Sequence, residues 1–286
     1  CNNFFIEDVL GKKILHDVKK ETIIKKSFFQ NHTTALIVVR TDSKRLPQKS
    51  LKKICGITTI EHCIKRVQSS KKVNNIILCT TKLNRDKILS RIAKKNKIDF
   101  YAGEIDNVLL RMISAIKQKK TDLVIRVTGD DILIDPYYLD KTIDFHLENN
   151  FEYTDNKALP SGTEVEIFNK EILKKIHFLA KDPSGTEYLT FYIKKNLNFF
   201  KTGSLKIKEK VHKKLKLTLD TPTDYKIIKS FLEGMHKQNK LFSYTLDDIL
   251  KFYKQNSKLF KKNKKTIKGL NVNTELEWKK ILSYQN

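Results

Sequence analysis

A cluster of basic and hydroxyl side chains follows the first strongly apolar stretch of the chain. Within VVRTDSKRLPQKSL, residues 38–51, these side chains belong to Arg40, Ser43, Lys44, Arg45 and Lys49. Guanidinium, ammonium and loop N–H groups can together neutralise a triphosphate. The loop has neither the GxxxxGK[ST] pattern of a P-loop nor the GxGxxG pattern of a dinucleotide fold. These residues alone leave two interpretations open, a phosphate site and a solvated basic surface.

Carboxylates follow two other apolar stretches. Asp130 and Asp131 come directly after DLVIRVTG, and Asp220 comes directly after LKLTL. Carboxylates at the ends of two strands can converge and hold Mg²⁺, which prefers a few carboxylates, water and phosphate oxygens. The alternatives are helix capping for Asp220 and Asp224 and a turn acid for Asp130. Together with the basic loop, the acids indicate metal-assisted phosphoryl or nucleotidyl transfer.

Short apolar runs alternate with amphipathic stretches around these motifs. The pattern predicts strands at 34–40, 75–81, 98–103 and 122–131, with helices near 58–70, 84–96 and 105–119. In the second half it predicts strands near 163–168, 199–204 and 214–219, with helices near 169–180, 185–196 and 222–236. This order is typical of an α/β fold, in which ligands bind at the carboxyl ends of the strands.

Three segments divide the chain. We expect an N-terminal extension or the remnant of a preceding domain at 1–33, a catalytic domain at 34–236 and a helical C-terminal extension at 237–286. Trp278 is a candidate docking anchor in the last segment, and the lysine-rich stretch 258–269 is interpreted as an exposed linker. The chain begins with Cys1 rather than Met, which is compatible with a fragment or a piece of a longer polypeptide.

The composition is strongly basic, with 57 Lys and Arg against 32 Asp and Glu and a formal net charge of +25. The lysines are spread over nearly every segment, which indicates a composition bias rather than one charged face. No aromatic-basic motif for nucleic-acid recognition accompanies them, so we expect no specific nucleic-acid partner. Arginine is used sparingly and ends at Arg126, so its positions favour sites where the geometry of the side chain matters.

The remaining composition predicts a cytoplasmic protein. No apolar run is long enough to span a bilayer, and the start has no apolar core of a signal peptide, so we expect no membrane insertion. The cysteines show no paired spacing typical of metal ligands, and buried free thiols in a reducing compartment are the default expectation. They are Cys1, Cys55, Cys63 and Cys79.

The stretch RTDSKRLPQKSL, 40–51, resembles the motif R-x-G-S-x-R-L-P-G-K-x-L of cytidylyltransferases that activate acidic sugars. The resemblance is to the spore-coat-polysaccharide type, related to CMP-3-deoxy-manno-octulosonate and CMP-sialic acid synthetases. It covers roughly residues 34–230, and its further motifs follow in order: Arg66, CTT 79–81 with Asp86, 103–111, 125–136, 160–168, 187–193 and 217–225. It implies a Rossmann-like nucleotide-diphosphosugar-transferase fold with a mixed, mainly parallel sheet. The implied reaction converts CTP and a sugar acid into CMP-sugar and pyrophosphate.

The resemblance also implies roles for individual residues. Triphosphate binding falls to Arg40, Ser43, Arg45 and Lys49, and Mg²⁺ binding to Asp130 and Asp220. Arg40, Arg45, Lys49 and Asp130 are the residues implied to be catalytic. Thr80, Arg111 and Thr128 match positions near the nucleotide, and Glu164, Glu166, Glu187 and Thr190 match positions on the sugar side. Relatives of this type further imply a homodimer.

The sequence departs from the family pattern at several positions. Asp42 and Gln48 stand where the motif has glycine, Tyr188 stands where many relatives have histidine, and no proline follows the acidic pair 130–131. These departures keep two alternatives open: a nucleotidyltransferase for another NTP or alcohol, and a catalytically weakened homologue that serves as a binding or scaffold subunit. The stretch 6–29 resembles the end of the antifreeze-like domain of sialic-acid-synthase-type enzymes; the alternative is an ordinary amphipathic lead-in.

Overall fold

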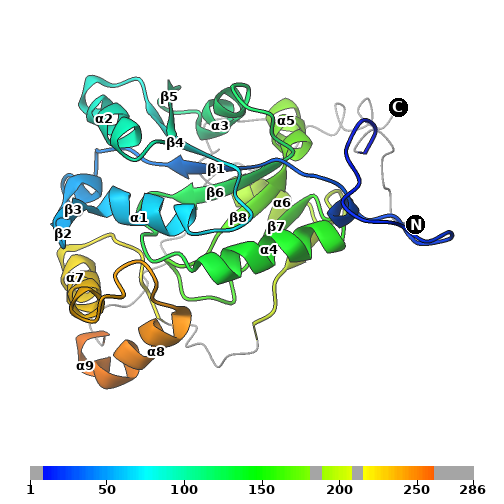
Figure 1. Ribbon diagram of the computed structural model, residues 1–286. Coiled ribbons are helices and arrows are strands. Elements are labelled where there is room, and N and C mark those ends of the chain that lie inside the picture. Colours follow the sequence, from blue (N-terminus) through cyan, green and yellow to red (C-terminus); the bar gives the residue numbers. More distant parts are fainter. Residues whose placement is uncertain (1–8, 181–188, 208–214, 261–286) are drawn as a thin grey trace.

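A seven-stranded sheet forms the centre of the protein (Figure 1). The structure, a computed structural model, describes residues 9–180, 189–207 and 215–260. Within these residues the strand order is β5-β4-β1-β6-β8-β7-β9. The strands are β1 (Thr33–Val38), β4 (Asn75–Thr81), β5 (Asp99–Gly103), β6 (Leu123–Thr128), β7 (Tyr153–Asp155), β8 (Glu166–Asn169) and β9 (Thr202–Ser204).

The sheet is mixed and mainly parallel, which confirms the predicted fold class. Strands β5, β4, β1 and β6 run parallel to one another, and β8 pairs antiparallel with both β6 and β7. Strand β9 rejoins the sheet parallel to β7. Parallel β1 and β6 therefore end side by side, with Val38 paired to Thr128, and this edge carries both the basic loop and the acidic turn.

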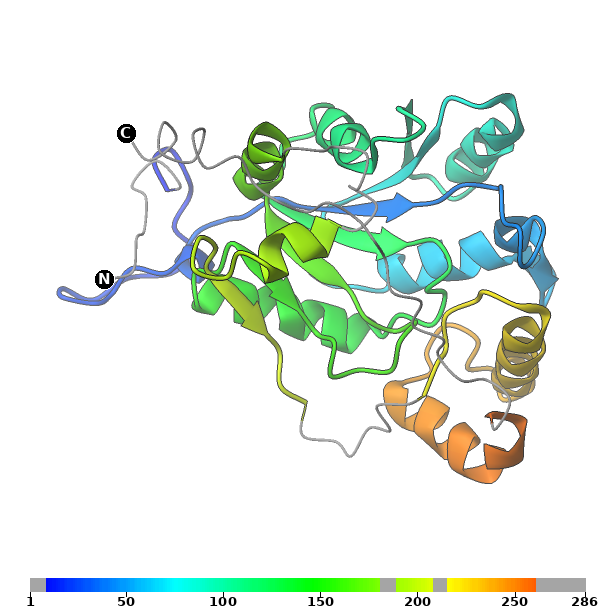
Figure 2. The same ribbon diagram turned by 180° about the vertical axis from the view of Figure 1, so that it is seen from behind.

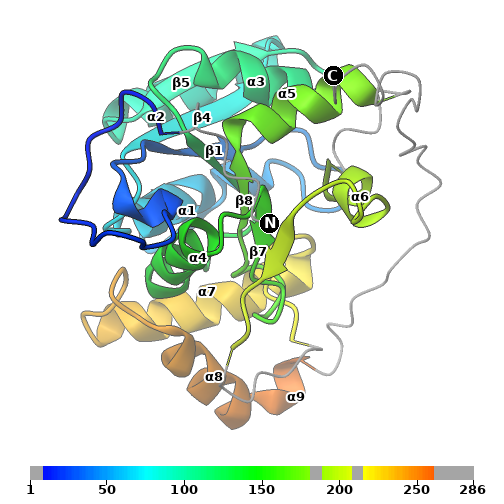
Figure 3. The ribbon, with the colours of Figure 1, turned by 90° about the vertical axis from the view of Figure 1, so that its right-hand side faces the viewer.

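Helices cover both faces of the sheet (Figure 3). One face packs against α1 (Thr59–Gln68), α2 (Ile88–Lys95), α4 (Pro136–Glu148) and α7 (Pro222–Lys237), and the other against α3 (Val108–Ile116), α5 (Lys170–Leu179) and α6 (Leu189–Lys194). Successive residues of a strand point to opposite faces. In β1, Ala35 and Ile37 accordingly join the first layer, and Leu36 joins the second.

Capping residues explain where the site-bearing helices begin. Thr58 and Glu61 form a capping box at the start of α1, and Thr221 and Asp224 form one at the start of α7. Each side chain satisfies a backbone N–H group that the first helical turn leaves without a partner. The capping alternative is thus confirmed for Asp224.

The predicted elements of the first half are confirmed, with ends shifted by a few residues. The helix expected at 84–96 begins as a 3-10 turn at Asn84–Asp86 and continues as α2. The sequence reading missed α4, although Asp135 caps it and Pro136 opens it, and it missed β7. It also missed the short hairpin of β2 (Lys53–Ile54) and β3 (Ile57–Thr58).

The strand predicted at 214–219 is wrong. Among its described residues only Lys216 forms a bridge, an isolated parallel one with Ser161. The segment crosses between two anchors instead of pairing along one strand, because Leu217 N–H donates to the Ser161 carbonyl and Leu219 N–H donates to the Asp130 carbonyl. Gly162 permits the crossing: its φ is +103°, and a Cβ there would lie 2.3 Å from the carbonyl carbon of Leu217.

The helices α7, α8 (Leu246–Gln255) and α9 (Ser257–Phe260) lie together below the sheet in Figure 1. Arg66 of α1 links this region to the sheet edge. Its guanidinium is buried, donates to the carbonyls of Ile134 at 2.7 Å and Phe242 at 2.8 Å, and lies 3.9 Å from the centre of the Tyr244 ring. The proposed division at 236/237 stays a prediction, and Trp278 lies outside the described residues.

The N-terminal segment extends from the end of the molecule opposite α7 (Figure 2). Its described part has a 3-10 turn at Lys26–Phe28 and an isolated bridge between Ile14 and Phe29. An ion pair of 3.0 Å between Lys12 and Asp122 attaches it to the start of β6. In the described part of the chain, no helix has the length and apolar character needed to span a bilayer.

Candidate active site

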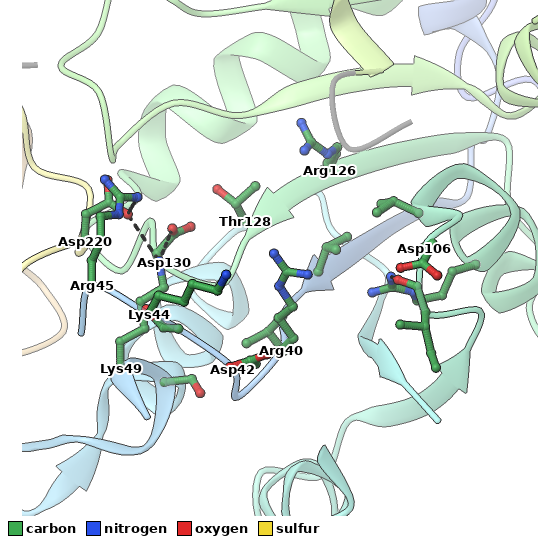
Figure 4. Close-up of a pocket in the computed structure, with 18 residues that line it drawn as sticks. Arg40, Asp42, Lys44, Arg45, Lys49, Asp106, Arg126, Thr128, Asp130 and Asp220 are labelled. Atoms are coloured by element: carbon green, nitrogen blue, oxygen red, sulfur yellow. Dashed lines mark hydrogen bonds and ion pairs between the residues drawn. The ribbon is translucent and has the colours of Figure 1, made fainter. Parts of the chain in front are cut away.

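A cavity of about 830 Å³ opens at the carboxyl ends of β1 and β6 (Figure 4). Of the residues singled out from the sequence, it brings together Arg40, Ser43, Arg45, Lys49, Arg111, Thr128, Asp130 and Asp220. The volume is within the range of small-molecule sites and near its upper end. The basic loop and the two acids therefore share one concave site, as the sequence predicted.

The basic loop is held in place by a buried carboxylate in the 3-10 turn that follows β4. Asp86 accepts hydrogen bonds from the Thr41 backbone N–H at 2.8 Å and the Thr41 hydroxyl at 2.6 Å, and it also accepts one from the Thr81 hydroxyl. Burial alone would raise the pKa of Asp86, but the hydrogen bonds from Thr41 and Thr81 lower it. The charged carboxylate thereby fixes the backbone next to Arg40.

Gln48 and Asp42, which stand where the family motif has glycine, are accommodated in different ways. Gln48 has a φ of +52°, in the left-handed region where glycine is favoured, so this position carries backbone strain. Asp42 is not in that region, and its carboxylate pairs with Arg85 at 2.8 Å. Arg85 thus offsets the negative charge that Asp42 adds.

The strain at Gln48 gives a testable consequence. Gln48→Gly is expected to raise the free energy of unfolding by about 0.5–1 kcal/mol, because it removes a left-handed penalty of about 1–2 kcal/mol while increasing the entropy of the unfolded chain. Urea denaturation measures the change. Gln48→Ala keeps the penalty and serves as the matched control; a glycine variant no more stable than the alanine variant would show that the loop is not strained here.

One ammonium group joins the basic loop to both acids. Lys49 Nζ lies 2.5 Å from Asp130 Oδ2 and 3.3 Å from Asp220 Oδ1. Asp220 also pairs with Arg45 at 2.9 Å and with Lys216 at 3.4 Å. Burial alone would lower the pKa of Lys49, but Asp130 and Asp220 raise it, so Lys49 is charged. Asp130 and Asp220 therefore converge on one cation position.

The second acid of the pair 130–131 has a different environment. Asp131 is buried and accepts a hydrogen bond from the Thr128 hydroxyl. Burial, reinforced by the charge of Asp130, raises the pKa of Asp131 well above its usual range. Asp130, which lines the cavity, is therefore the acid of this pair that presents a carboxylate to a ligand.

The donor set around Lys49 fits a Mg²⁺ ion that shares its ligands with a substrate. The described residues contain no group of three or more His, Cys, Asp or Glu side chains that could hold a metal. Two convergent carboxylates, with Lys49 standing in for the cation, leave the other ligand positions to water and phosphate oxygens. Mg²⁺ is commonly held this way in enzymes that act on nucleotides.

Of the three further residues predicted near the nucleotide, two line the cavity and one does not. Arg111 lines the cavity and donates to the carbonyls of Glu104 at 2.8 Å and Ile105 at 3.0 Å, so it also holds the loop before α3. Thr128 lines the cavity, and its role near the nucleotide stays a prediction. Thr80 is fully buried and does not line it. The reason is strand alternation, because Thr80 shares the face of Leu78 and not that of Cys79.

Of the residues predicted on the sugar side, those that the structure describes do not line the cavity. Glu166 lies behind its wall, paired at 2.6 Å with Arg126 of the neighbouring strand, and it accepts hydrogen bonds from Thr190 and Tyr153. Burial alone would raise the pKa of Glu166, but Arg126 and Lys157 lower it to about 2. Glu164 is absent from the lining, and Glu187 lies outside the described residues.

Sequence reasoning missed two charged residues of the cavity wall, Arg126 and Asp106. Arg126 could have been found from two signals, the scarcity of arginine and its position two residues before Thr128 on β6, which places both on one face of the strand. Asp106 had only the weaker signal of an acid in a loop before a helix.

Comparison with known proteins agrees with this geometry. The family model described as Cytidylyltransferase matches residues 34–263. The spore coat polysaccharide biosynthesis protein SpsF of Bacillus subtilis is 28% identical over 209 residues, which cover 71% of this chain and 87% of SpsF. The 3-deoxy-manno-octulosonate cytidylyltransferase of Syntrophotalea carbinolica is 26% identical over 137 residues, covering 46% of this chain and 48% of that enzyme.

A solved structure extends the likeness to three dimensions. A cytidylyltransferase from Leptospira borgpetersenii superimposes with a TM-score of 0.75 at 27% identity, over 84% of this chain and all (100%) of the other. Residues 1–33 precede the matched range, so the likeness of the N-terminal stretch to an antifreeze-like domain stays a prediction. The fold, the cavity at the strand ends and the match over residues 34–263 lead to one conclusion: the chain belongs to the cytidylyltransferase family.

Proposed function

We propose that the protein transfers CMP from CTP to an acidic sugar of the ulosonic or nonulosonic type, releases pyrophosphate and depends on Mg²⁺. The observation that carries this proposal is the convergence of the basic loop and the pair Asp130 and Asp220 on Lys49. The similarity to an octulosonate cytidylyltransferase and to a spore-coat-polysaccharide protein supports the sugar class.

The charge of the cavity supports two anionic substrates. Six basic residues and four acidic residues line it, and three of the acids, Asp42, Asp130 and Asp220, already pair with cations. An acidic sugar and a triphosphate are both negative, so a cavity with an excess of cations lowers the cost of bringing them together. A neutral alcohol would not need this excess.

The reaction follows from these positions. Arg40, Arg45 and Lys49 would offset the charge of the triphosphate, and Asp130 and Asp220 would hold Mg²⁺. When bound, Mg²⁺ supplies further neutralisation of the phosphate oxygens. A sugar hydroxyl attacks the α-phosphorus and loses its proton to solvent. The bond to the bridging oxygen of the β-phosphate breaks, and pyrophosphate leaves with that electron pair. Catalysis then consists of alignment and charge stabilisation.

Pyrophosphate release tests the proposal. The protein is incubated with Mg²⁺, each of the four NTPs and a panel of sugar acids that includes 3-deoxy-manno-octulosonate and N-acetylneuraminate, with neutral sugars as controls. We expect release with CTP and a sugar acid. Release with another NTP or only with neutral alcohols would favour the wider nucleotidyltransferase alternative, and no release with any pair would favour the scaffold alternative.

We further propose that the enzyme is a cytoplasmic homodimer. Cys55, Cys63 and Cys79 are free thiols, which supports a reducing compartment. The dimer rests on the resemblance to sugar-acid cytidylyltransferases, and sedimentation of the full chain measures it.

A further inference from the structure

The cavity has two chemically different ends (Figure 4). One end holds the carboxylate pair with Lys49 and Arg45, and across the cavity from it lies Asp106, in the loop before α3. Apolar residues line the cavity near this loop: Val38 at the end of β1, Ile105, and Val108 at the first position of α3. The second end therefore combines apolar side chains with the Asp106 carboxylate and with the Arg111 guanidinium, which is bound to carbonyls of the loop.

The loop that carries Asp106 is fixed at both sides. Before it, the Arg111 guanidinium holds the carbonyls of Glu104 and Ile105. After it, the Asn107 side chain accepts the Leu110 N–H at 2.8 Å and caps α3. Gly103 permits this packing, since a Cβ there would lie 2.9 Å from Arg111 Cγ. The position of the Asp106 backbone is thus set by the fold before any ligand arrives.

The Asp106 carboxylate is available to a ligand. It lines the cavity, is exposed, and none of the residues that the structure describes forms a hydrogen bond or ion pair with it. An ionised carboxylate only accepts hydrogen bonds. A ligand group at this position must therefore be a donor, and another acceptor would be repelled.

A nucleotide whose triphosphate lies along the basic loop and whose metal lies at Asp130 and Asp220 extends its base toward the opposite end. There the ring faces of the base meet Val38, Ile105 and Val108. Cytosine carries an exocyclic N4 amine, which donates to Asp or Glu side chains, whereas uracil carries the acceptor O4 at the same position. We propose that Asp106 selects cytosine over uracil in the donor nucleotide, an inference that rests on the proposed function.

The experiment compares Asp106→Asn with Glu104→Gln. The amide that Asp106→Asn introduces can donate to O4 of uracil and can still accept from N4 of cytosine, so this nearly isosteric change removes the requirement for a donor. Glu104 is the matched control because it is in the same loop, pairs with Lys82 at 2.9 Å and does not line the cavity. Two readouts are taken for CTP and UTP: equilibrium dissociation constants in the presence of Mg²⁺, by titration calorimetry, and kcat/KM for pyrophosphate release with a sugar acid.

We expect the preference of the wild type for CTP over UTP to fall by about tenfold or more in Asp106→Asn, in line with the discrimination of a base-edge hydrogen bond, and to stay unchanged in Glu104→Gln. An Asp106→Asn protein that keeps the wild-type preference would overturn the assignment, and so would an equal loss in Glu104→Gln. The two proposals can fail separately. If the wild type binds CTP more tightly than UTP and Asp106→Asn does not, but neither protein releases pyrophosphate, then the selection by Asp106 is supported and the proposed reaction is contradicted.

Discussion

Asp130→Asn is expected to lower kcat for pyrophosphate release by about a thousandfold or more while the protein stays folded. Asp130 lies at the carboxyl end of β6, lines the cavity and is 2.5 Å from the Lys49 ammonium. An amide of the same shape removes the charge that would hold Mg²⁺ and orient Lys49. The loss is expected in the chemical step, because the contacts proposed for Arg40 and Arg45 with the triphosphate are unchanged.

The control for this variant is Asp144→Asn, a partly exposed acid of α4 that pairs with Lys72 at 2.8 Å and does not line the cavity. It changes the net charge equally and is expected to keep full activity. Circular dichroism and the urea midpoint show whether Asp130→Asn is folded. A folded Asp130→Asn protein with more than a tenth of wild-type kcat would contradict the metal assignment.

Lys49→Met is expected to have two opposite effects. It lowers kcat/KM for CTP by about a hundredfold to a thousandfold, because the ammonium proposed to offset the charge of the triphosphate is lost. It strengthens the binding of Mn²⁺ in the absence of nucleotide, because Asp130 and Asp220 lose the cation that neutralises them. Mn²⁺, which replaces Mg²⁺ as a spectroscopic probe, is measured by electron paramagnetic resonance of the free ion.

Lys53→Met, at an exposed position of β2, is the matched control and is expected to change neither property. The metal readout makes the result informative even if Lys49→Met is inactive. Weaker Mn²⁺ binding in Lys49→Met than in the wild type would show that Lys49 does not occupy the position of the metal.

The chemistry at the strand ends could be predicted from the sequence because it depends on short-range signals. Strands β1 and β6 are mainly apolar, and the residues that follow them, such as Arg40 and Asp130, fall at one edge of a parallel sheet. Asp220 was harder, since no strand carries it; the hydrogen bonds of Leu217 to Ser161 and of Leu219 to Asp130 bring it to the site.

The rest of the site depends on which face a side chain takes and on contacts between distant segments. Thr80 was assigned to the nucleotide from its motif, but one step of strand alternation places it in the core. Glu166 was assigned to the sugar, but the antiparallel register sets it opposite Arg126, and the ion pair between them neutralises its charge. Asp106 became a candidate only when the fold placed it across the cavity from Asp130.

The buried Arg66 affects how the protein unfolds locally. Its guanidinium holds the turn that follows Asp130 and Asp131 and the segment that precedes α8. If either partner detached, a charged group inside the protein would lose a carbonyl acceptor, which costs more than opening an ordinary surface contact. Helix α1, the acidic turn and the C-terminal helices should therefore unfold locally as one cooperative unit. The free energy of opening the backbone next to Asp130 is then set in part by residues remote from the cavity.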